Sequence, residues 1–410
     1  MHILYIHQYF ATPNGSIVTR AYEFSKVWMA KGHKITMLTT TAKLTAEDMK
    51  NAKGRFLKKI NIEGINVLAF KIPYEQKMSK IKRYLSWIAF IVFSVVTTLF
   101  TRNIDLIFAR TTPLTAGIPA IFAKKLKKTP FVFDVTDQWP EVPIEMGMVR
   151  NKIIIKILLW LEKTLYKYSD AIIACSPGMA NGVKEVMTRN KLKDKPIKVV
   201  PNFSETKVYH PDVDGSFVRK ERGWDDKLVF LHAGSMGTAN SLNFIIDVAL
   251  NLREHPEILF VLIGAGNEKH SLEKRVKELG LTNVEISAIV LRQQLPAVIA
   301  AADISLVIFG NVPILQDNSA NKFFDALAAG NPVLINYSGW QREVLEENNA
   351  GYGCQQYDPD EFVEKVLYLN SHRDELLEIG MNARRVAVDK YDRQKLAMEA
   401  LNVIENVKLS

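Results

Sequence analysis

The residue types best suited to chemistry gather near position 320. Lys322 precedes Asp325 by one helical turn, and Asn318 and Ser319 stand just before a stretch with helical character. Ser and Asn are strong helix N-cap residues. A helix N-terminus with a lysine in its first turn attracts an anion such as a diphosphate, and a nearby carboxylate can accept hydrogen bonds from a ribose diol. The segment therefore predicts a nucleotide-diphosphate site; the alternative is an ordinary cap with a solvated Lys322.

A glycine-bearing loop, His232–Asn240, follows a predicted buried strand. Gly234 and Gly237 would let backbone amides approach phosphate oxygens, although a strand-to-helix turn can also need glycine for steric reasons. Residues 264–266 match part of a dinucleotide fingerprint, but Lys269 stands where the third glycine is required. This pattern favours phosphate contact and disfavours nicotinamide binding.

Polar segments after strands of the first half form a second set of candidates. Asp134–Glu141 places carboxylates and an indole at a strand end, a combination that holds sugars through hydrogen bonds and an aromatic face. Asp137 is the best pocket carboxylate there, with a turn-stabilising role as the alternative. His7, which opens the loop after the first strand, is more typical of a histidine bonded to backbone at the edge of a core. The predicted acceptor contacts are Asn14, Gly15, Arg20, Trp139 and Glu141.

The composition disfavours several function classes. Only Cys175 and Cys354 occur, which argues against a disulfide framework or a cysteine-based zinc site and favours a reducing cytoplasm. The Asp pairs at 212/214 and 358/360 lie in turns where Asp is ordinary, so no metal is assigned. No zinc-finger spacing or RNA-binding aromatic signature occurs, so nucleic acid is not an expected partner.

The basic charge points to a membrane surface. The net charge is +9, and basic residues before position 200 are interleaved with apolar ones. Leu85–Phe100 is uncharged; as a helix these sixteen residues rise about 24 Å, short of the roughly 30 Å hydrocarbon core. We expect this helix to cover the first sheet and to dip an outer apolar face into the bilayer, assisted by Lys152–Lys167. The alternative is a fully buried helix between domains.

Hydrophobic patterning sets the elements that must position these residues. Short apolar runs alternate with amphipathic helical stretches, such as Ile17–Lys31, along the whole chain. This predicts an α/β protein with two Rossmann-like, doubly wound parallel sheets. The expected domains are 1–203 and 204–390, with a final helix at 391–410 that packs back on the first domain. Since ligands bind at the carboxyl ends of parallel strands, the site is expected in a cleft between the two sheets.

Several of these segments, in order along nearly the whole chain, resemble the GT-B glycosyltransferases, in particular the retaining family 4. The similarity is carried by the acidic pair Asp317 and Asp325 with the Ala-rich helix and Gly-Asn-Pro-Val that follow. It continues in shorter matches at 9–10, 14–15, 32–36, 137–141, 201–202 and 264–266. The subgroup most resembled adds amino sugars of the fucosamine type in bacterial surface polysaccharide synthesis.

The resemblance implies an enzyme that moves a sugar from a UDP-sugar to a polyprenyl-diphosphate-linked acceptor at the inner face of the cytoplasmic membrane. It also implies that a helix terminus and cations, without a metal or other cofactor, stabilise the leaving diphosphate. The donor-binding candidates are Gly234, Ser235, Gly237, Gly266, Arg292, Ser319, Asn321, Lys322 and Asp325. The catalytic candidates are Asp137, Asp317 and Lys322.

Two departures from the family pattern matter for the site. Aspartates stand at 317 and 325 where the family usually has glutamates, and the loop 232–240 lacks the arginine and lysine common there. Lys322 would then be the main diphosphate cation and Arg292 a second one. Two other function classes remain open: a nucleotide-sugar epimerase of the same fold, and a non-catalytic nucleotide- or carbohydrate-binding scaffold.

Overall fold

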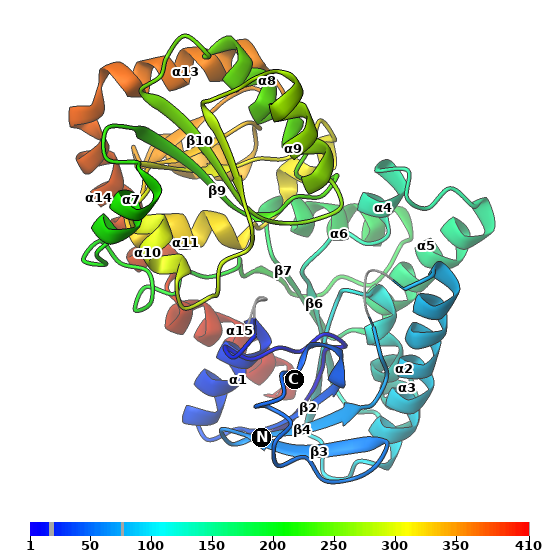
Figure 1. Ribbon diagram of the computed structural model, residues 1–410. Helices are drawn as coiled ribbons and strands as arrows, with labels where there is room; N and C mark the ends of the chain where they lie inside the picture. Colours follow the sequence, from blue (N-terminus) through cyan, green and yellow to red (C-terminus); the bar gives the residue numbers. More distant parts are fainter. Residues whose placement is uncertain (16–19, 75–77, 410) are drawn as a thin grey trace. The chain divides into compact units, whose positions relative to one another are not determined.

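The computed structural model describes residues 1–15, 20–74 and 78–409 (Figure 1). The chain forms two compact units: unit 1 contains Met1–Pro201 and Gln394–Ser410, and unit 2 contains Asn202–Arg393. The start of the predicted helix Ile17–Lys31 lies outside the described residues, and its described part is α1 (Arg20–Ala30).

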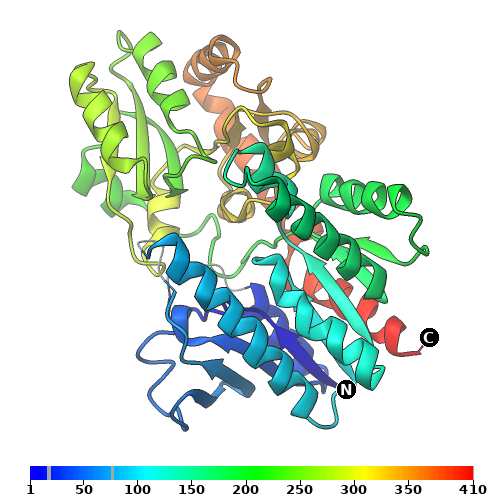
Figure 2. The same ribbon diagram turned by 90° about the vertical axis from the view of Figure 1, so that its right-hand side faces the viewer.

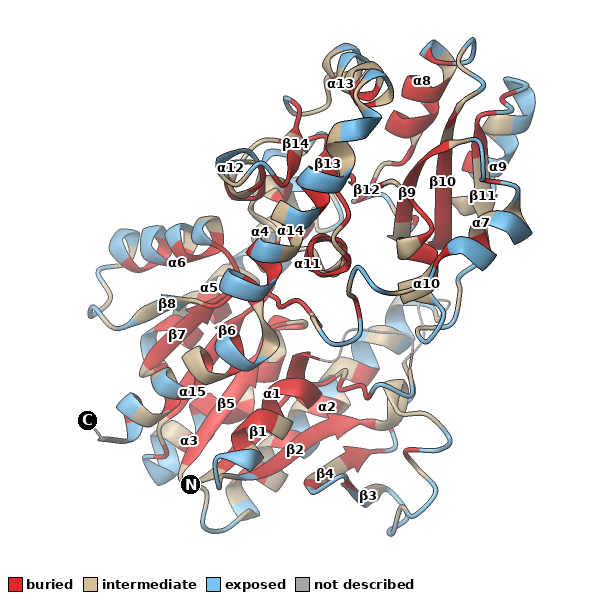
Figure 3. Cartoon of the chain, turned by 90° about the vertical axis from the view of Figure 1, so that its left-hand side faces the viewer, coloured by how far each residue is buried: buried red, intermediate tan, exposed pale blue. Residues whose placement is uncertain are grey.

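Unit 1 is built on an eight-stranded sheet in the order β3-β4-β2-β1-β5-β6-β7-β8. Its strands are β1 (His2–Ile6), β2 (Lys34–Thr40), β3 (Leu57–Ile62), β4 (Ile65–Phe70), β5 (Leu106–Arg110), β6 (Phe131–Val135), β7 (Ala171–Ala174) and β8 (Ile197–Val199). All neighbours pair in parallel except β3 and β4. The central strands are near-continuous apolar runs because helices cover both of their faces, and Figure 3 shows them buried.

The helices of unit 1 form two layers. They are α1, α2 (Lys80–Phe100), α3 (Ile118–Lys127), α4 (Glu141–Glu145), α5 (Lys152–Tyr168), α6 (Pro177–Arg189) and α15 (Arg393–Leu409), with short 3₁₀ turns η1 (Thr41–Lys43) and η2 (Leu114–Gly117). Side chains of α2, α3, α5 and α6 share one apolar core with the sheet. On the other face Trp28 of α1 stacks on Tyr5 and donates a 2.8 Å hydrogen bond to the Ala397 carbonyl of α15.

Unit 2 holds a six-stranded, all-parallel sheet in the order β11-β10-β9-β12-β13-β14. The strands are β9 (Leu228–Ser235), β10 (Ile258–Ala265), β11 (Val284–Ser287), β12 (Ile304–Val307), β13 (Val333–Ile335) and β14 (Gly351–Gly353). The helices are α7 (Ser216–Arg222), α8 (Asn243–Asn251), α9 (Lys269–Glu278), α10 (Leu295–Ala300), α11 (Asn321–Ala329), α12 (Trp340–Glu347), α13 (Pro359–Ser371) and α14 (Leu376–Tyr391), with η3 (Pro313–Asp317) and η4 (Arg373–Glu375). The predicted α/β architecture with two parallel-sheet domains is confirmed.

The long apolar helix α2 is not fully buried within unit 1, and the alternative of a helix buried between domains stays a prediction. Leu85, Ile88 and Val92 are 59%, 56% and 52% exposed, whereas Phe90 is 0% exposed and belongs to the core of unit 1. One face of α2 therefore packs on the protein and the other is uncovered.

Candidate functional site

In unit 2, Lys322 lies in the first turn of α11 and against the last residues of β9. Its Nζ is 3.3 Å from Nε2 of His232 and 6.0 Å from the centroid of the Phe309 ring. A Cβ added to Gly234 would lie 3.1 Å from both Cε and Nζ of Lys322. The lysine therefore occupies space that only a glycine leaves open, and the fold brings these two predicted donor residues together.

The charge of Lys322 is poorly compensated. Burial lowers the pKa of its ammonium to about 7, and no carboxylate in the described part of the chain opposes this shift. His232 is buried, and desolvation together with the Lys322 charge keeps its pKa well below the usual value, so it is a neutral imidazole. An arriving diphosphate would supply the missing negative charge and raise the pKa of Lys322.

The predicted capping roles of Asn318 and Ser319 are wrong. The N-cap of α11 is Ala320, which offers no side-chain hydrogen bond. Ser319 Oγ instead accepts from the backbone amide of Asn202 at 3.0 Å, and Asn318 donates to the Leu315 carbonyl. The first amides of α11 thus lack a side-chain cap, which leaves them suited to an anion.

Asp325 lies one turn further along α11, beside a charged pair that the sequence did not reveal. Desolvation and the neighbouring Glu205 carboxylate raise the pKa of Asp325 to about 8. Arg292, which partly offsets this rise, forms an ion pair with Glu205. Arg292 is therefore held near Asp325, but through Glu205, a residue in the loop before unit 2's sheet with no motif to mark it.

The remaining donor candidates have different surroundings. A Cβ on Gly266 would lie 2.1 Å from the Met236 carbonyl oxygen, so this glycine is needed for two loops to pack closely. A Cβ on Gly237 would lie 3.3 Å from Asn267 Oδ1. Ser235 is exposed at the end of β9. Asp317 ends η3, and Asn321 begins α11.

In unit 1, the carboxyl ends of three neighbouring parallel strands, β1, β5 and β6, bring polar residues together. Arg110 ends β5 beside Asp134 of β6, with 4.0 Å between Arg110 Nε and Asp134 Oδ2. His7 follows β1, the other neighbour of β5; burial and the Arg110 charge keep its pKa well below the usual value. The sequence did not single out Arg110, although its place at a strand end next to Thr111 and Thr112 is a usable signal.

Asp137 follows β6 and is exposed. Its carboxylate accepts a hydrogen bond from the Thr112 hydroxyl, and its amide donates to Thr111 Oγ1 at 3.3 Å. Thr112 has φ +77°, a left-handed conformation that β-branched residues rarely adopt and that concentrates at functional sites. Asp137 thus stabilises its turn through these hydrogen bonds, and its carboxylate is still accessible. The geometry therefore fits both a turn-stabilising role and a role as a pocket carboxylate.

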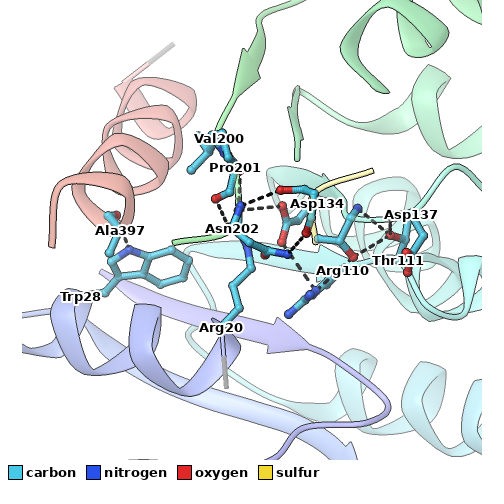
Figure 4. A network of polar contacts seen from close by, with 12 residues as sticks. Arg20, Trp28, Arg110, Thr111, Asp134, Asp137, Val200, Pro201, Asn202 and Ala397 are labelled. Atoms are coloured by element: carbon cyan, nitrogen blue, oxygen red, sulfur yellow. Dashed lines mark hydrogen bonds and ion pairs between the residues drawn. The ribbon is translucent and has the colours of Figure 1, made fainter. Parts of the chain in front are cut away.

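Arg20 has no exposed surface. Its guanidinium donates to the carbonyls of Val200 and Pro201 and lies 3.6 Å from Asp134 (Figure 4). These contacts favour a structural role in unit 1, and the predicted contact between Arg20 and an acceptor stays a prediction.

Asp48 holds the loop 7–15 after β1, which the sequence predicts to contact the acceptor. Asn14 Nδ2 donates to Asp48 Oδ1 at 2.9 Å, Thr12 Oγ1 donates to the same carboxylate at 2.8 Å, and the Gly15 amide donates to the Thr12 carbonyl at 3.0 Å. Asn14 itself is exposed, so it can meet a ligand at the surface of unit 1.

Trp139 and Glu141 make contacts within unit 1. The Trp139 ring is half-buried and packs against the apolar core. Glu141 lies near Glu162 of α5, and desolvation together with the Glu141 charge raises the pKa of Glu162 to about 8. The Glu162 carboxyl group is therefore largely protonated at neutral pH. Within the residues that the structure describes, no group of three or more His, Cys, Asp or Glu side chains could hold a metal ion.

Two family models match the chain. Residues 15–202 match the glycosyl transferase 4-like domain, and residues 216–386 match the glycosyl transferases group 1.

Curated relatives align over part of the chain. Spore coat protein SA of Bacillus subtilis (strain 168) is 25% identical over 223 residues, which are 51% of this chain and 58% of that protein. The putative colanic acid biosynthesis glycosyl transferase WcaI of Escherichia coli (strain K12) is 31% identical over 111 residues, 26% of this chain and 27% of that protein. The alignments thus span less than two thirds of these relatives' length.

A solved structure aligns over the whole chain. Alr3699/HepE of Anabaena, in complex with UDP-glucose, has a TM-score of 0.71 and 16% identity, and the alignment covers 99% of this chain and 100% of that one. This likeness shows a shared fold.

Proposed function

We propose, from the premise that the chain belongs to the group 1, GT4-like glycosyltransferases of GT-B fold, that it transfers a sugar from a UDP-sugar to an acceptor carried on a polyprenyl diphosphate. The observation that carries the donor half is Lys322, a desolvated cation between the uncapped start of α11 and Gly234. Unit 2 holds the donor, and unit 1 holds the acceptor.

The electrostatics of unit 2 suit a leaving diphosphate. Lys322 and the first amides of α11 both place positive charge at the N-terminus of this helix. Such preorganised groups stabilise the negative charge that develops on a leaving group. Asp325, with its raised pKa, can both donate a hydrogen bond to a ribose hydroxyl and accept one from it. A uridine nucleotide is favoured because the Anabaena structure of the same fold holds UDP-glucose.

The stereochemical course follows from family membership. Retention is proposed to proceed by front-face attack guided by the leaving phosphate, with Asp317 near the transferred sugar. Asp137 and the exposed Asn14 are proposed to contact the acceptor. A role in bacterial surface polysaccharide synthesis is supported by the similarity to the putative colanic acid transferase. An N-acetylated amino or deoxyamino sugar is proposed as donor from the subgroup that the sequence resembles.

The test is a mass-spectrometric screen of UDP-sugars against lipid-linked monosaccharides. We expect one donor to be consumed and the acceptor to gain one sugar, with Lys322→Ala as the inactive control. Isomerised sugar without acceptor would instead identify an epimerase. A chain that binds UDP but turns over no donor would instead be a scaffold. In that case Asp325→Ala would leave UDP binding unchanged.

A further inference from the structure

Three helices of unit 1 present uncovered apolar side chains on the same side. Helices α2, α3 and α5 lie side by side, α3 packing against both others (Figure 2). Beyond the exposed residues of α2 described above, Leu126 of α3 is 67% exposed, and Ile157 and Trp160 of α5 are 56% and 63% exposed. Large exposed apolar patches of this kind mark interaction surfaces.

The spacing along α2 separates a protein face from an outer face. Leu85, Ile88 and Val92 recur at three- and four-residue intervals and form one stripe. The buried positions Phe90 and Ser94 recur on the opposite stripe and are 0% exposed. Helix α2 therefore lies flat on unit 1, with its outer stripe available along its whole length.

The same three helices carry a strong charge bias. By sequence they contain ten Lys and Arg residues and one acidic residue, Glu162. Glu162 is buried and, with its raised pKa, protonated for much of the time at neutral pH. The outward surface is thus apolar along the helix stripes and cationic between them, which is complementary to a layer of anionic lipid headgroups over hydrocarbon.

A spanning orientation does not fit these contacts. By length and composition alone, Ile81–Phe100 could cross a membrane. However, α2 shares its inner face with the core of unit 1, so insertion across the bilayer would carry the seven lysines of α3 and α5 toward the hydrocarbon. An orientation in the plane of the interface keeps lysines at the headgroups and places only the stripes in the acyl region.

We infer that the outward faces of α2, α3 and α5 form one docking surface that holds unit 1 on an anionic bilayer. The docking surface also contacts the loop 7–15, which is the predicted acceptor loop. Trp87 of α2 donates a 2.7 Å hydrogen bond to the Tyr9 hydroxyl, and both rings contact Tyr74. Docking therefore brings the loop that begins at His7 close to the membrane surface. This last step rests on the proposed function, because it is there that a polyprenyl-diphosphate headgroup would lie.

Co-sedimentation with vesicles tests the docking surface. The probes are vesicles of phosphatidylcholine alone and of phosphatidylcholine with phosphatidylglycerol. We expect the full chain to bind the anionic vesicles, to bind the neutral ones at least about tenfold more weakly, and to be released by added salt, as expected for several lysines near charged headgroups. The double variant Ile88→Glu/Val92→Glu should lose binding at least about tenfold.

A matched control is Leu377→Glu on α14 of unit 2, where the leucine is 74% exposed, and it should bind vesicles like the wild type. Both variants must show the wild-type circular dichroism and UDP affinity. Wild-type protein that ignores anionic vesicles, or a folded double variant that binds them unchanged, would overturn the inference. So would self-association in sedimentation velocity that the double variant abolishes, since the surface would then contact a second copy.

Sugar transfer to a water-soluble acceptor analogue separates this inference from the proposed function. Loss of vesicle binding with intact transfer in the double variant is the expected result. Vesicle binding by a chain that transfers no sugar would leave the docking surface standing and remove the proposed activity.

Discussion

Lys322 is a desolvated cation whose charge the protein compensates poorly, and we propose that a bound diphosphate stabilises it. Removal of the ammonium should therefore harm turnover but not folding. We expect Lys322→Ala to lower kcat at least about tenfold, about 1.4 kcal/mol of transition-state stabilisation, with no loss in thermal stability. Steady-state kinetics and thermal unfolding measure the two effects. Unchanged kcat in a folded variant would remove Lys322 from the mechanism.

The lowered pKa of Lys322 also predicts a pH dependence of donor binding. At pH 6 most of the ligand-free protein carries the charged ammonium, and at pH 8 most of it does not, since the pKa is about 7. Because an anion binds the charged form, affinity for the predicted donor should fall as the pH rises through this range. Isothermal titration with UDP-glucose, whose diphosphate does not titrate there, measures the change.

The control for this pH dependence is Lys322→Arg. A guanidinium stays charged throughout the range, so the variant should show a flatter profile than the wild type if it binds. An equally steep fall in Lys322→Arg would assign the titration to another group, and Asp325, with its pKa of about 8, would be the first to examine.

At the scale of elements, Gly234 near the end of β9 and Gly266 after β10 have distinct roles. Ala at 234 would press its Cβ on the flexible end of Lys322, 3.1 Å away, whereas Ala at 266 would meet the Met236 backbone at 2.1 Å. We expect Gly234→Ala to fold and to bind donor about tenfold more weakly. Gly266→Ala should lose roughly 1–3 kcal/mol of stability. Titration with UDP and denaturant unfolding distinguish them; equal stability losses in both variants would contradict the assignment.

The carboxyl groups of Glu141 on α4 and Glu162 on α5 should make the stability of the protein depend on pH. Because burial and Glu141 raise the pKa of Glu162 to about 8, the folded chain binds more protons than the unfolded chain between about pH 5 and pH 8. Stability contributed by this pair is therefore lost as the pH rises. Glu162→Gln should stabilise the protein at pH 8 relative to the wild type.

The matched control for that pair is Glu145→Gln, an exposed position on α4 that should change little. Thermal unfolding at pH 5.5 and pH 8 provides the comparison. If Glu162→Gln is no more stable than the wild type at pH 8, the pKa of Glu162 is not raised in the folded protein.

Local sequence predicted the elements of the site better than their contacts. The end of α11 at Gly330 and the place of Lys322 in its first turn follow from rules that act within a few residues, whereas the predicted side-chain cap at its start does not form. The role of Ser319 does not follow from such rules, because its hydroxyl is engaged by Asn202, which is 117 positions away in the chain. Glu205 was missed for the same reason: its importance comes only from the tertiary approach of Arg292 and Asp325.

At the scale of the molecule, the alternation of apolar runs and amphipathic helices was sufficient for the two parallel-sheet domains, because burial on both faces of a parallel strand leaves a strong mark in sequence. The two faces of helix α2 were harder to predict in detail. Its uncharged stretch indicated an outer apolar face, but the sequence did not distinguish the outward positions from Phe90, which is a core residue, or from Trp87, which donates a hydrogen bond to Tyr9. Only packing distinguishes the two stripes of such a helix.

The whole-molecule charge distribution leads to a last prediction, on metal dependence. In unit 2 the positive charge proposed to stabilise a leaving diphosphate comes from Lys322 and the α11 amides, both fixed by the fold. A divalent ion would then duplicate charge that the protein already supplies, so EDTA should leave sugar transfer nearly intact at saturating UDP-sugar. A complete loss of transfer that Mg²⁺ restores would mean that Lys322 is insufficient and that the donor enters as its metal complex.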